Sequence, residues 1–205
     1  MTIANIVRTV GWVVGIVYST IPSYWLLVHP HVEWWRRRGA KLSRVGPLWL
    51  LLWVAIGAIT WPWRQWALYG SAWTWIAGVP LILAGFVVYR GARENFSTDQ
   101  VLGRSELQPD RHEQRLHTGG IRAMVRHPYY LGHLCELLGW SIGTGLLVLW
   151  CMLAFALITG AIMIRAEERE LVARFGESYR EYQRKVRAIF PRLPRATSAS
   201  SGRHS

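Results

Sequence analysis

Acidic residues and cysteines are scarce in this sequence of 205 residues. It has 12 Asp and Glu against 24 Lys and Arg, which gives a net charge of +12, and two cysteines, Cys135 and Cys151. Two cysteines in apolar stretches do not make a disulfide framework, so a disulfide-built secreted domain is excluded. We expect both thiols to be packing residues, and the sequence predicts no metal site.

Charged residues are absent from three long stretches of the chain. Residues 45–63, 72–89 and 142–164 contain no Lys, Arg, Asp or Glu. Each is about as long as the ~20 apolar residues that cross a bilayer core. Many of the 13 Trp residues gather at the ends of the apolar runs, and indole rings prefer the membrane–water interface. This pattern excludes a water-soluble enzyme and a disordered chain, and it predicts an integral membrane protein.

The order of apolar and polar stretches predicts an all-α, polytopic membrane protein with about five transmembrane helices. The first apolar stretch is too long for a signal peptide and lacks a small-residue cleavage site, so we expect it to be retained. Glycines near the middle of the last stretch predict a helical hairpin that bends near 143–145. A charged amphipathic helix is expected to follow, as far as about Ile189. The expected crossings are 3–28, 45–63, 72–89 and the two arms of the hairpin within 129–164.

Basic residues are concentrated in three polar stretches, and this predicts the orientation. Residues 29–44, 90–128 and 165–205 together hold 22 of the 24 Lys and Arg, which leaves Arg8 and Arg64 elsewhere. The positive-inside rule then predicts an N-terminus outside and a C-terminus in the cytoplasm, with a bacterial inner membrane as the expected location. The basic charge also favours contact with anionic lipid. No basic stripe is interleaved with exposed aromatic residues, so we expect no nucleic-acid partner.

The long polar connector ends in a glycine-containing turn that suits an anion. Gly119 and Gly120 let the backbone approach a ligand closely, and Pro128 fits the first turn of a helix. The free N–H groups of that helix start, with Arg126 and His127 beside them, favour a carboxylate or another anionic group. The alternative is a simple membrane-entry turn with interfacial Arg and His side chains.

A row of polar and aromatic residues lies within the fourth expected crossing. Tyr129, His133, Glu136 and Trp140 follow one another at spacings of four, three and four, so they share one helical face. Glu136 lies about two turns into the apolar run, where an ionisable group is costly unless it is paired. We therefore regard Glu136 as a candidate functional residue. The alternative is that Glu136 and His133 satisfy each other or a neighbouring helix.

A third feature directly follows the last apolar stretch. The paired acids Glu167 and Glu168 are not needed for topology, and they could reach back to Arg126 or to a bound cation. The alternative is that the alternating charges of 165–182 form a solvated amphipathic helix.

Two of these features together resemble a known family. Residues 119–132 read Gly-Gly-Ile-Arg-Ala-Met-Val-Arg-His-Pro-Tyr-Tyr-Leu-Gly, and a Glu-Glu pair at 167–168 is followed by Phe-Gly-x-x-Tyr-x-x-Tyr up to Tyr182. In order and spacing they resemble the isoprenylcysteine carboxyl methyltransferases and the related phospholipid methyltransferase-like membrane enzymes. The resemblance covers about residues 80–192.

The resemblance implies an integral membrane methyltransferase that uses S-adenosylmethionine, enclosed between the connector, the start of the hairpin and the C-terminal helix. We accordingly expect 1–192 to be a single domain whose cofactor-binding part is about 90–192, and 193–205 to be a disordered tail. Arg126, Glu168 and Glu136 are the candidate catalytic residues. The candidate cofactor-binding residues are Leu116, His117, Gly120, His127, Tyr130 and Glu167.

The implied chemistry fits these residue types. Methyl transfer from a sulfonium is an in-line displacement, and orienting donor and acceptor can supply ~7–11 kcal/mol of the barrier. Arg126 suits the donor's carboxylate through charge-assisted hydrogen bonds. A carboxylate acceptor needs no general base, whereas an amine, thiol or hydroxyl needs one, with His127, His133 and Glu136 as candidates. We expect a lipophilic acceptor that enters between helices from the bilayer.

Two other classes of function stay open. One is an NADPH-dependent membrane reductase of the sterol-reductase type, whose C-terminal helices resemble this family. Against it, 205 residues and five crossings are few, and there is no Rossmann-type glycine fingerprint. The other is a non-enzymatic membrane protein in which His133 and Glu136 form a helix–helix contact or an ion path.

Overall fold

The structure, a computed structural model, describes residues 2–38, 45–94 and 115–191. All regular elements in this part are helices, apart from two isolated β-bridges, so the expected all-α class is confirmed. The α-helices are α1 (Ile3–Val28), α2 (Val32–Arg37), α3 (Val45–Thr60), α4 (Trp75–Arg93), α7 (Pro128–Thr144), α8 (Leu147–Phe175) and α9 (Glu177–Lys185). The expected tail at 193–205 lies outside the described residues.

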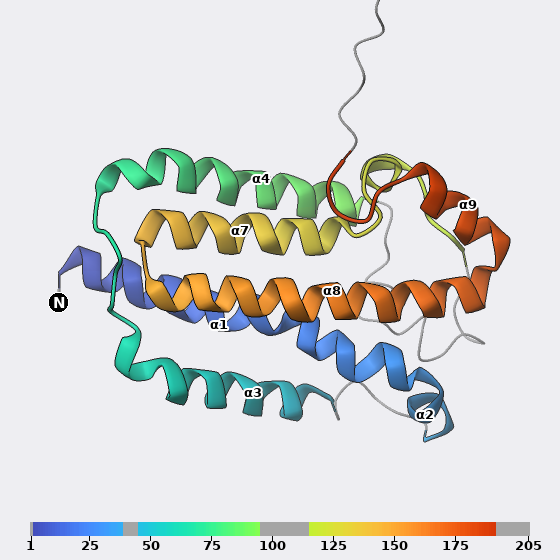
Figure 1. Cartoon of the computed structure of the whole chain (residues 1–205), viewed down its shortest axis with the longest axis horizontal. Coiled ribbons are helices and arrows are strands. Elements are labelled where there is room, and N and C mark those ends of the chain that lie inside the picture. The colour runs from blue at the N-terminus through green and yellow to red at the C-terminus, as the bar shows by residue number, and fades with distance from the viewer. Residues whose placement is uncertain (1, 39–44, 95–114, 192–205) are drawn as a thin grey trace, which may run out of the picture.

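The long helices lie side by side as a bundle (Figure 1). The closest pairs are α4 with α7 and α1 with α8, while α3 packs on α1. At the α4–α7 seam the two backbones touch, because a Cβ added to Gly139 would lie 2.7 Å from the carbonyl oxygen of Gly78. Small residues permit this approach, which is typical of helix packing in membranes.

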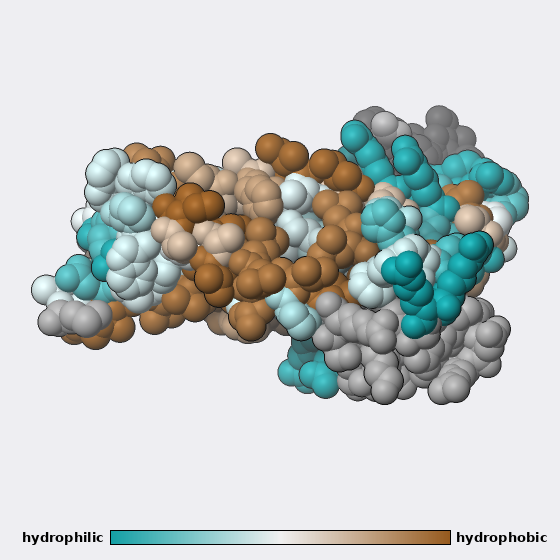
Figure 2. Space-filling model, turned by 90° about the horizontal axis from the view of Figure 1, so that it is seen from below, coloured by the Kyte–Doolittle hydropathy of each residue, from teal (hydrophilic) through white to brown (hydrophobic). Residues whose placement is uncertain are grey.

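Four helical segments are long and apolar enough to cross a membrane, and this confirms a multi-pass membrane protein. They are Ile3–Arg37, Val45–Trp63, Ala72–Arg93 and Leu147–Phe175. An apolar belt is exposed around the middle of the bundle, with polar residues at both ends (Figure 2). With 17 residues, α7 is not one of these four segments, so the fifth crossing stays a prediction.

The chain reverses direction between α7 and α8. Gly145 has a φ of 66°, a conformation that favours glycine, and a Cβ there would lie 2.5 Å from the carbonyl oxygen of Tyr69. The N–H of Leu68 donates to the carbonyl of Gly145 at 2.8 Å, and the N–H of Leu147 donates to Trp66 at 3.0 Å. This turn is thereby fixed to the segment that connects α3 to α4.

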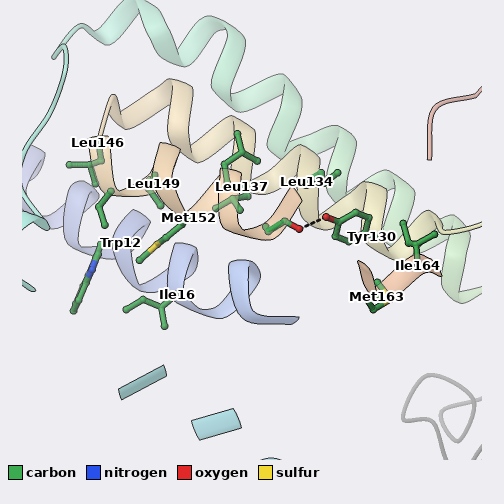
Figure 3. Packing of buried hydrophobic residues seen from close by; sticks show 13 residues of the cluster. Trp12, Ile16, Tyr130, Leu134, Leu137, Leu146, Leu149, Met152, Met163 and Ile164 are labelled. Atoms are coloured by element: carbon green, nitrogen blue, oxygen red, sulfur yellow. Dashed lines mark hydrogen bonds between the residues drawn. The ribbon is translucent and has the colours of Figure 1, made fainter. Parts of the chain in front are cut away.

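The buried core lies between α1, α7 and α8 (Figure 3). It contains mainly Leu, Ile and Met side chains, with Trp12 and Tyr130 among them. Both thiols are free; Cys135 is half-buried, whereas Cys151 is exposed, so the expected packing role fits Cys135 but not Cys151.

The expected helix from 165 to Ile189 is not continuous. Its first part is the end of α8, which runs unbroken from the apolar stretch to Phe175, and α9 begins after Gly176, whose φ is 59°. The helix then ends at Lys185 rather than at Ile189. The chain beyond Lys185 becomes extended because it pairs with another segment, as described next.

Candidate functional site

The two sequence motifs meet at the end of the bundle where α7 begins. A short parallel bridge joins Val125 to Arg187. The N–H groups of Arg126 and His127 donate to the carbonyls of Arg187 and Ala188, both at 2.9 Å. The segment after α9 therefore fixes the backbone of the Arg-His-Pro motif. The side chains of Arg126, His127, Glu167 and Glu168 meet here, and we call them the charged cluster.

Arg126 connects α8 to the segment after α9. Its Nε lies 2.8 Å and its Nη2 2.5 Å from Oε1 of Glu168. Its Nη1 donates to the carbonyls of Gln183 and Val186. Both side chains of the ion pair are largely buried. The contact between Glu168 and Arg126 that the sequence suggested is thus present, and Arg126 has protein partners for both ends of its guanidinium group.

His127 bridges the two acids through opposite ring nitrogens. Its Nδ1 lies 3.2 Å from Glu167 and its Nε2 lies 3.1 Å from Glu168. Burial by itself would lower the pKa of His127, but the charges and hydrogen bonds of Glu167 and Glu168 outweigh it and raise the pKa to about 9. The imidazole is therefore charged near neutral pH and donates to both carboxylates.

Three further residues lie around this arrangement, and the sequence analysis proposed none of them as a site residue. The amide nitrogen of Gln183 donates to Oε2 of Glu168 at 3.0 Å. The guanidinium of Arg122 donates to the carbonyl of Ala92 on α4 at 2.9 Å, and the Tyr182 hydroxyl donates to the carbonyl of Arg122 at 2.6 Å. Tyr182 belongs to the second motif, but nothing in the sequence marks Gln183.

Two candidate residues lie away from the charged cluster. The hydroxyl of Tyr130 donates to the carbonyl of Ala156 on α8, inside the apolar core (Figure 3). Glu136 is 1% exposed and lies in the middle of α7, where its carboxyl group packs against Gly85 of α4. The structure therefore does not bring Tyr130 and Glu136 together with Arg126 and Glu168.

The remaining candidates lie in the connector before α7. Leu116 and His117 are half-buried, and Gly120 begins the short 3₁₀ turn Gly120–Ala123 with a φ of 61°. Their expected part in cofactor binding stays a prediction.

Two open hollows flank the charged cluster. One, of about 310 Å³, is lined by Glu168 and Gln183 together with Arg165, Arg169 and Val172. The other, of about 460 Å³, lies between the connector and α9. Its lining residues are Thr118, Ala123, Ser178, Glu181, Tyr182, Lys185 and Val186. Both are open hollows at the surface of the described residues rather than enclosed cavities.

Comparisons with known proteins agree with the two motifs. A family model described as phospholipid methyltransferase matches residues 73–178. The protein-S-isoprenylcysteine O-methyltransferase of Schizosaccharomyces pombe is 38% identical over 82 residues, which cover 38% of this chain and 33% of that protein. Methanethiol S-methyltransferase 2 of Bradyrhizobium diazoefficiens is 35% identical over 80 residues, which cover 39% of this chain and 30% of that protein.

A similar protein with a different name is the delta(14)-sterol reductase of Mus musculus. It is 31% identical over 115 residues, which cover 52% of this chain and 27% of the reductase. No solved structure gives a significant match. The alignments with these three relatives thus span only 27% to 33% of their own lengths. The family model, in contrast, matches more than half of this chain and includes the charged cluster, so the chain belongs to the phospholipid methyltransferase family.

Proposed function

We propose that this protein transfers a methyl group from S-adenosylmethionine to a lipophilic acceptor in the membrane. The observation that carries the proposal is the charged cluster, in which the two motifs meet between α7, α8 and the segment after α9. Membership of a membrane methyltransferase family supports the same reaction type.

The residues beside the cluster fit the methyl donor. The amino-acid end of S-adenosylmethionine carries an ammonium and a carboxylate group, so its site needs charges of both signs. The smaller hollow is lined by charges of both signs, the carboxylate of Glu168 and the guanidinium groups of Arg165 and Arg169. When bound, the cofactor supplies a methyl group on a positively charged sulfur atom.

Arg126 and His127 act in this proposal mainly as positioning residues. Their contacts hold Glu167 and Glu168 as oriented carboxylates, of which Glu168 lines the hollow. The donor's carboxylate, which the sequence analysis assigned to Arg126, is better matched by Arg165 or Arg169, because Arg126 already donates to Glu168 and two carbonyls. Fixed groups of this kind orient the donor and exclude water.

We further propose a topology for the single domain of residues 1–192. It has five crossings, with α7 and α8 as a hairpin, the N-terminus outside and the cofactor site facing the cytoplasm. The acceptor then enters from the bilayer side, through the apolar belt, while the donor enters from the cytoplasm (Figure 2).

Calorimetric titration of the detergent-purified protein tests the proposed reaction class. We expect saturable binding of S-adenosylhomocysteine and none of NADPH. Replacing Glu168 by Gln removes a charge from the hollow and from the ion pair with Arg126, so we expect at least tenfold weaker binding. The exposed Glu177, replaced by Gln, is the matched control and should leave binding unchanged.

Each other outcome has a definite meaning. Binding of NADPH instead would favour a reductase, to which the likeness to the mouse sterol reductase gives weight. Binding of neither ligand by a folded protein would contradict the proposal and favour a non-enzymatic membrane protein.

A further inference from the structure

One face of α7 carries polar side chains inside the bundle, apart from the charged cluster. Tyr18 of α1 and Tyr89 of α4 lean on His133 of α7 from two sides, with ring centroids 5.5 Å and 5.0 Å apart. The Tyr18 hydroxyl also lies against the carboxyl group of Glu136. We call Tyr18, Tyr89, His133 and Glu136 the mid-helix polar group.

Three of the four residues of this group are partly exposed. Both α1 and α4 pack on α7, but in the described part of the chain they are not among the helix pairs that pack closely together. Tyr18, Tyr89 and His133 are accordingly only half-buried, whereas Glu136, deeper between them, is buried. In this inference, the partly exposed side chains of Tyr18, Tyr89 and His133 are where a molecule in the bilayer meets the group.

Three polar atoms of the group have no hydrogen-bond partner among the described residues. They are Oε1 of Glu136, Nδ1 of His133 and the hydroxyl oxygen of Tyr89, and all three are buried. A buried polar atom without a hydrogen bond destabilises the folded protein. Mutual pairing of Glu136 and His133, the structural alternative from the sequence, does not account for these atoms. A ligand with its own polar group would satisfy them.

The charge of the group selects the kind of ligand. No Lys or Arg in the described part of the chain forms an ion pair with Glu136. A ligand carboxylate would thus meet another carboxyl group without a compensating cation, which is costly in an apolar environment. A hydroxyl, thiol or amine can instead donate to Glu136 or His133.

We propose that the mid-helix polar group binds the hydrogen-donating head of the lipophilic methyl acceptor, which is an alcohol, thiol or amine rather than a carboxylic acid. This assignment rests on the proposed methyl transfer. His133 lies six residues beyond His127 on the chain, about 9 Å along a helix axis. Methyl transfer therefore requires the sulfonium of a donor held at the charged cluster to extend over this distance along α7 and meet the head group.

The step is balanced without a further reactant. The acceptor's heteroatom forms a bond to the methyl carbon while the carbon–sulfur bond breaks. The electron pair of the broken bond stays on sulfur, and the donor becomes a neutral thioether. The proton of the head group passes to the carboxylate of Glu136. Replacing this carboxylate by the amide of Gln keeps a polar group but removes the proton acceptor, so it should lower the rate of methyl transfer rather than prevent binding of the head group.

Photolabelling tests the binding site without any methyl transfer. The probes are a twelve-carbon alcohol and the matched twelve-carbon acid, each with a diazirine next to its head group, in liposomes that contain the protein. We expect the alcohol to label the α4 and α7 segments around Tyr89 and His133 at least fivefold more than the acid does. Replacing Glu136 by Leu should reduce this labelling about tenfold, while Glu33→Gln, at an exposed position, should not. Equal labelling by the acid, or labelling elsewhere, would overturn the assignment.

A turnover assay tests the role of Glu136. With dodecanethiol, dodecanol and dodecylamine as acceptors, we expect Glu136→Gln to lower kcat at least a hundredfold and to change KM little. S-adenosylhomocysteine binding by the same variant shows that it is folded and that the donor site is intact. Unchanged kcat, or methylation of dodecanoic acid alone, would contradict the inference. Loss of donor binding in the unsubstituted protein would instead contradict the proposed function, whatever the labelling shows.

Discussion

His127 shows at the scale of one residue how the cluster depends on charge. Its pKa of about 9 lies above the ordinary value of 6.5 because Glu167 and Glu168 hold the charged imidazole against the cost of its burial. A group with a raised pKa in the folded state stabilises that state fully below its ordinary pKa, and the stabilisation is lost as the pH rises. The relevant window is therefore about pH 6.5 to 9.

We expect His127→Gln to destabilise the protein more at pH 6 than at pH 9.5. The shift corresponds to about 3 kcal/mol at the acidic end. Thermal unfolding in detergent at several pH values measures the difference between variant and unsubstituted protein. His31→Gln, at an exposed histidine, is the control and should show no such trend. A difference that grows with rising pH would contradict the role given to His127.

The contacts of individual side chains were the features that the sequence predicted least completely. The partnership of Arg126 with Glu168 followed from their charges and was confirmed. The double contact of His127 and the amide of Gln183 were not foreseen, because the first depends on how α8 packs beside the start of α7 and the second on how α9 folds back onto α8. Tyr130 is in a family motif, yet its hydroxyl bonds to Ala156 in the core, which only the packing of α7 on α8 determines.

At the scale of elements, the α4–α7 seam positions the mid-helix polar group. Gly139 of α7 lies so close to α4 that an added Cβ would be 2.7 Å from a backbone carbonyl, which cannot move as a flexible side chain can. We expect Gly139→Ala to destabilise the protein by ~1–3 kcal/mol, as overpacking does in well-packed cores.

Gly57 of α3 provides the matched control for this substitution. A Cβ there would meet the side chain of Ile16 at 3.6 Å, an ordinary contact, so Gly57→Ala should be neutral or slightly stabilising. Unfolding of both variants in detergent measures the two changes. Equal effects at the two glycines would contradict the close approach of α4 and α7.

The elements themselves were largely predictable, apart from the C-terminal ones. Apolar stretches without charge gave the long helices, since length and hydropathy suffice to recognise them. The break at Gly176 and the extended segment after Lys185 could not be read in this way. They depend on the hydrogen bonds from Arg126 and His127 to carbonyls some sixty residues away.

At the scale of the whole molecule, the turn between α7 and α8 links the fold to the membrane topology. The hydrogen bonds between this turn and residues 66–68 place it at the same end of the bundle as the connection from α3 to α4. In the proposed topology the N-terminus is outside and α3 and α4 both cross the bilayer, so that end lies on the outer side. The 17 residues of α7 extend about 26 Å, nearly the thickness of the hydrocarbon core. We therefore expect α7 to cross as well.

Cysteine labelling with a membrane-impermeant maleimide in intact cells checks this topology. After Cys135 and Cys151 are replaced by Ala, we expect Ser71→Cys, before α4, to react from outside. Ser178→Cys, on α9 beside the charged cluster, should react only after the membrane is permeabilised, because the proposed topology places the donor site and the basic residues on the cytoplasmic side. Reaction of both cysteines from outside would mean an even number of crossings after residue 71. The cofactor site would then be separated from the cytoplasmic supply of S-adenosylmethionine, and both the topology and the proposed function would fail together.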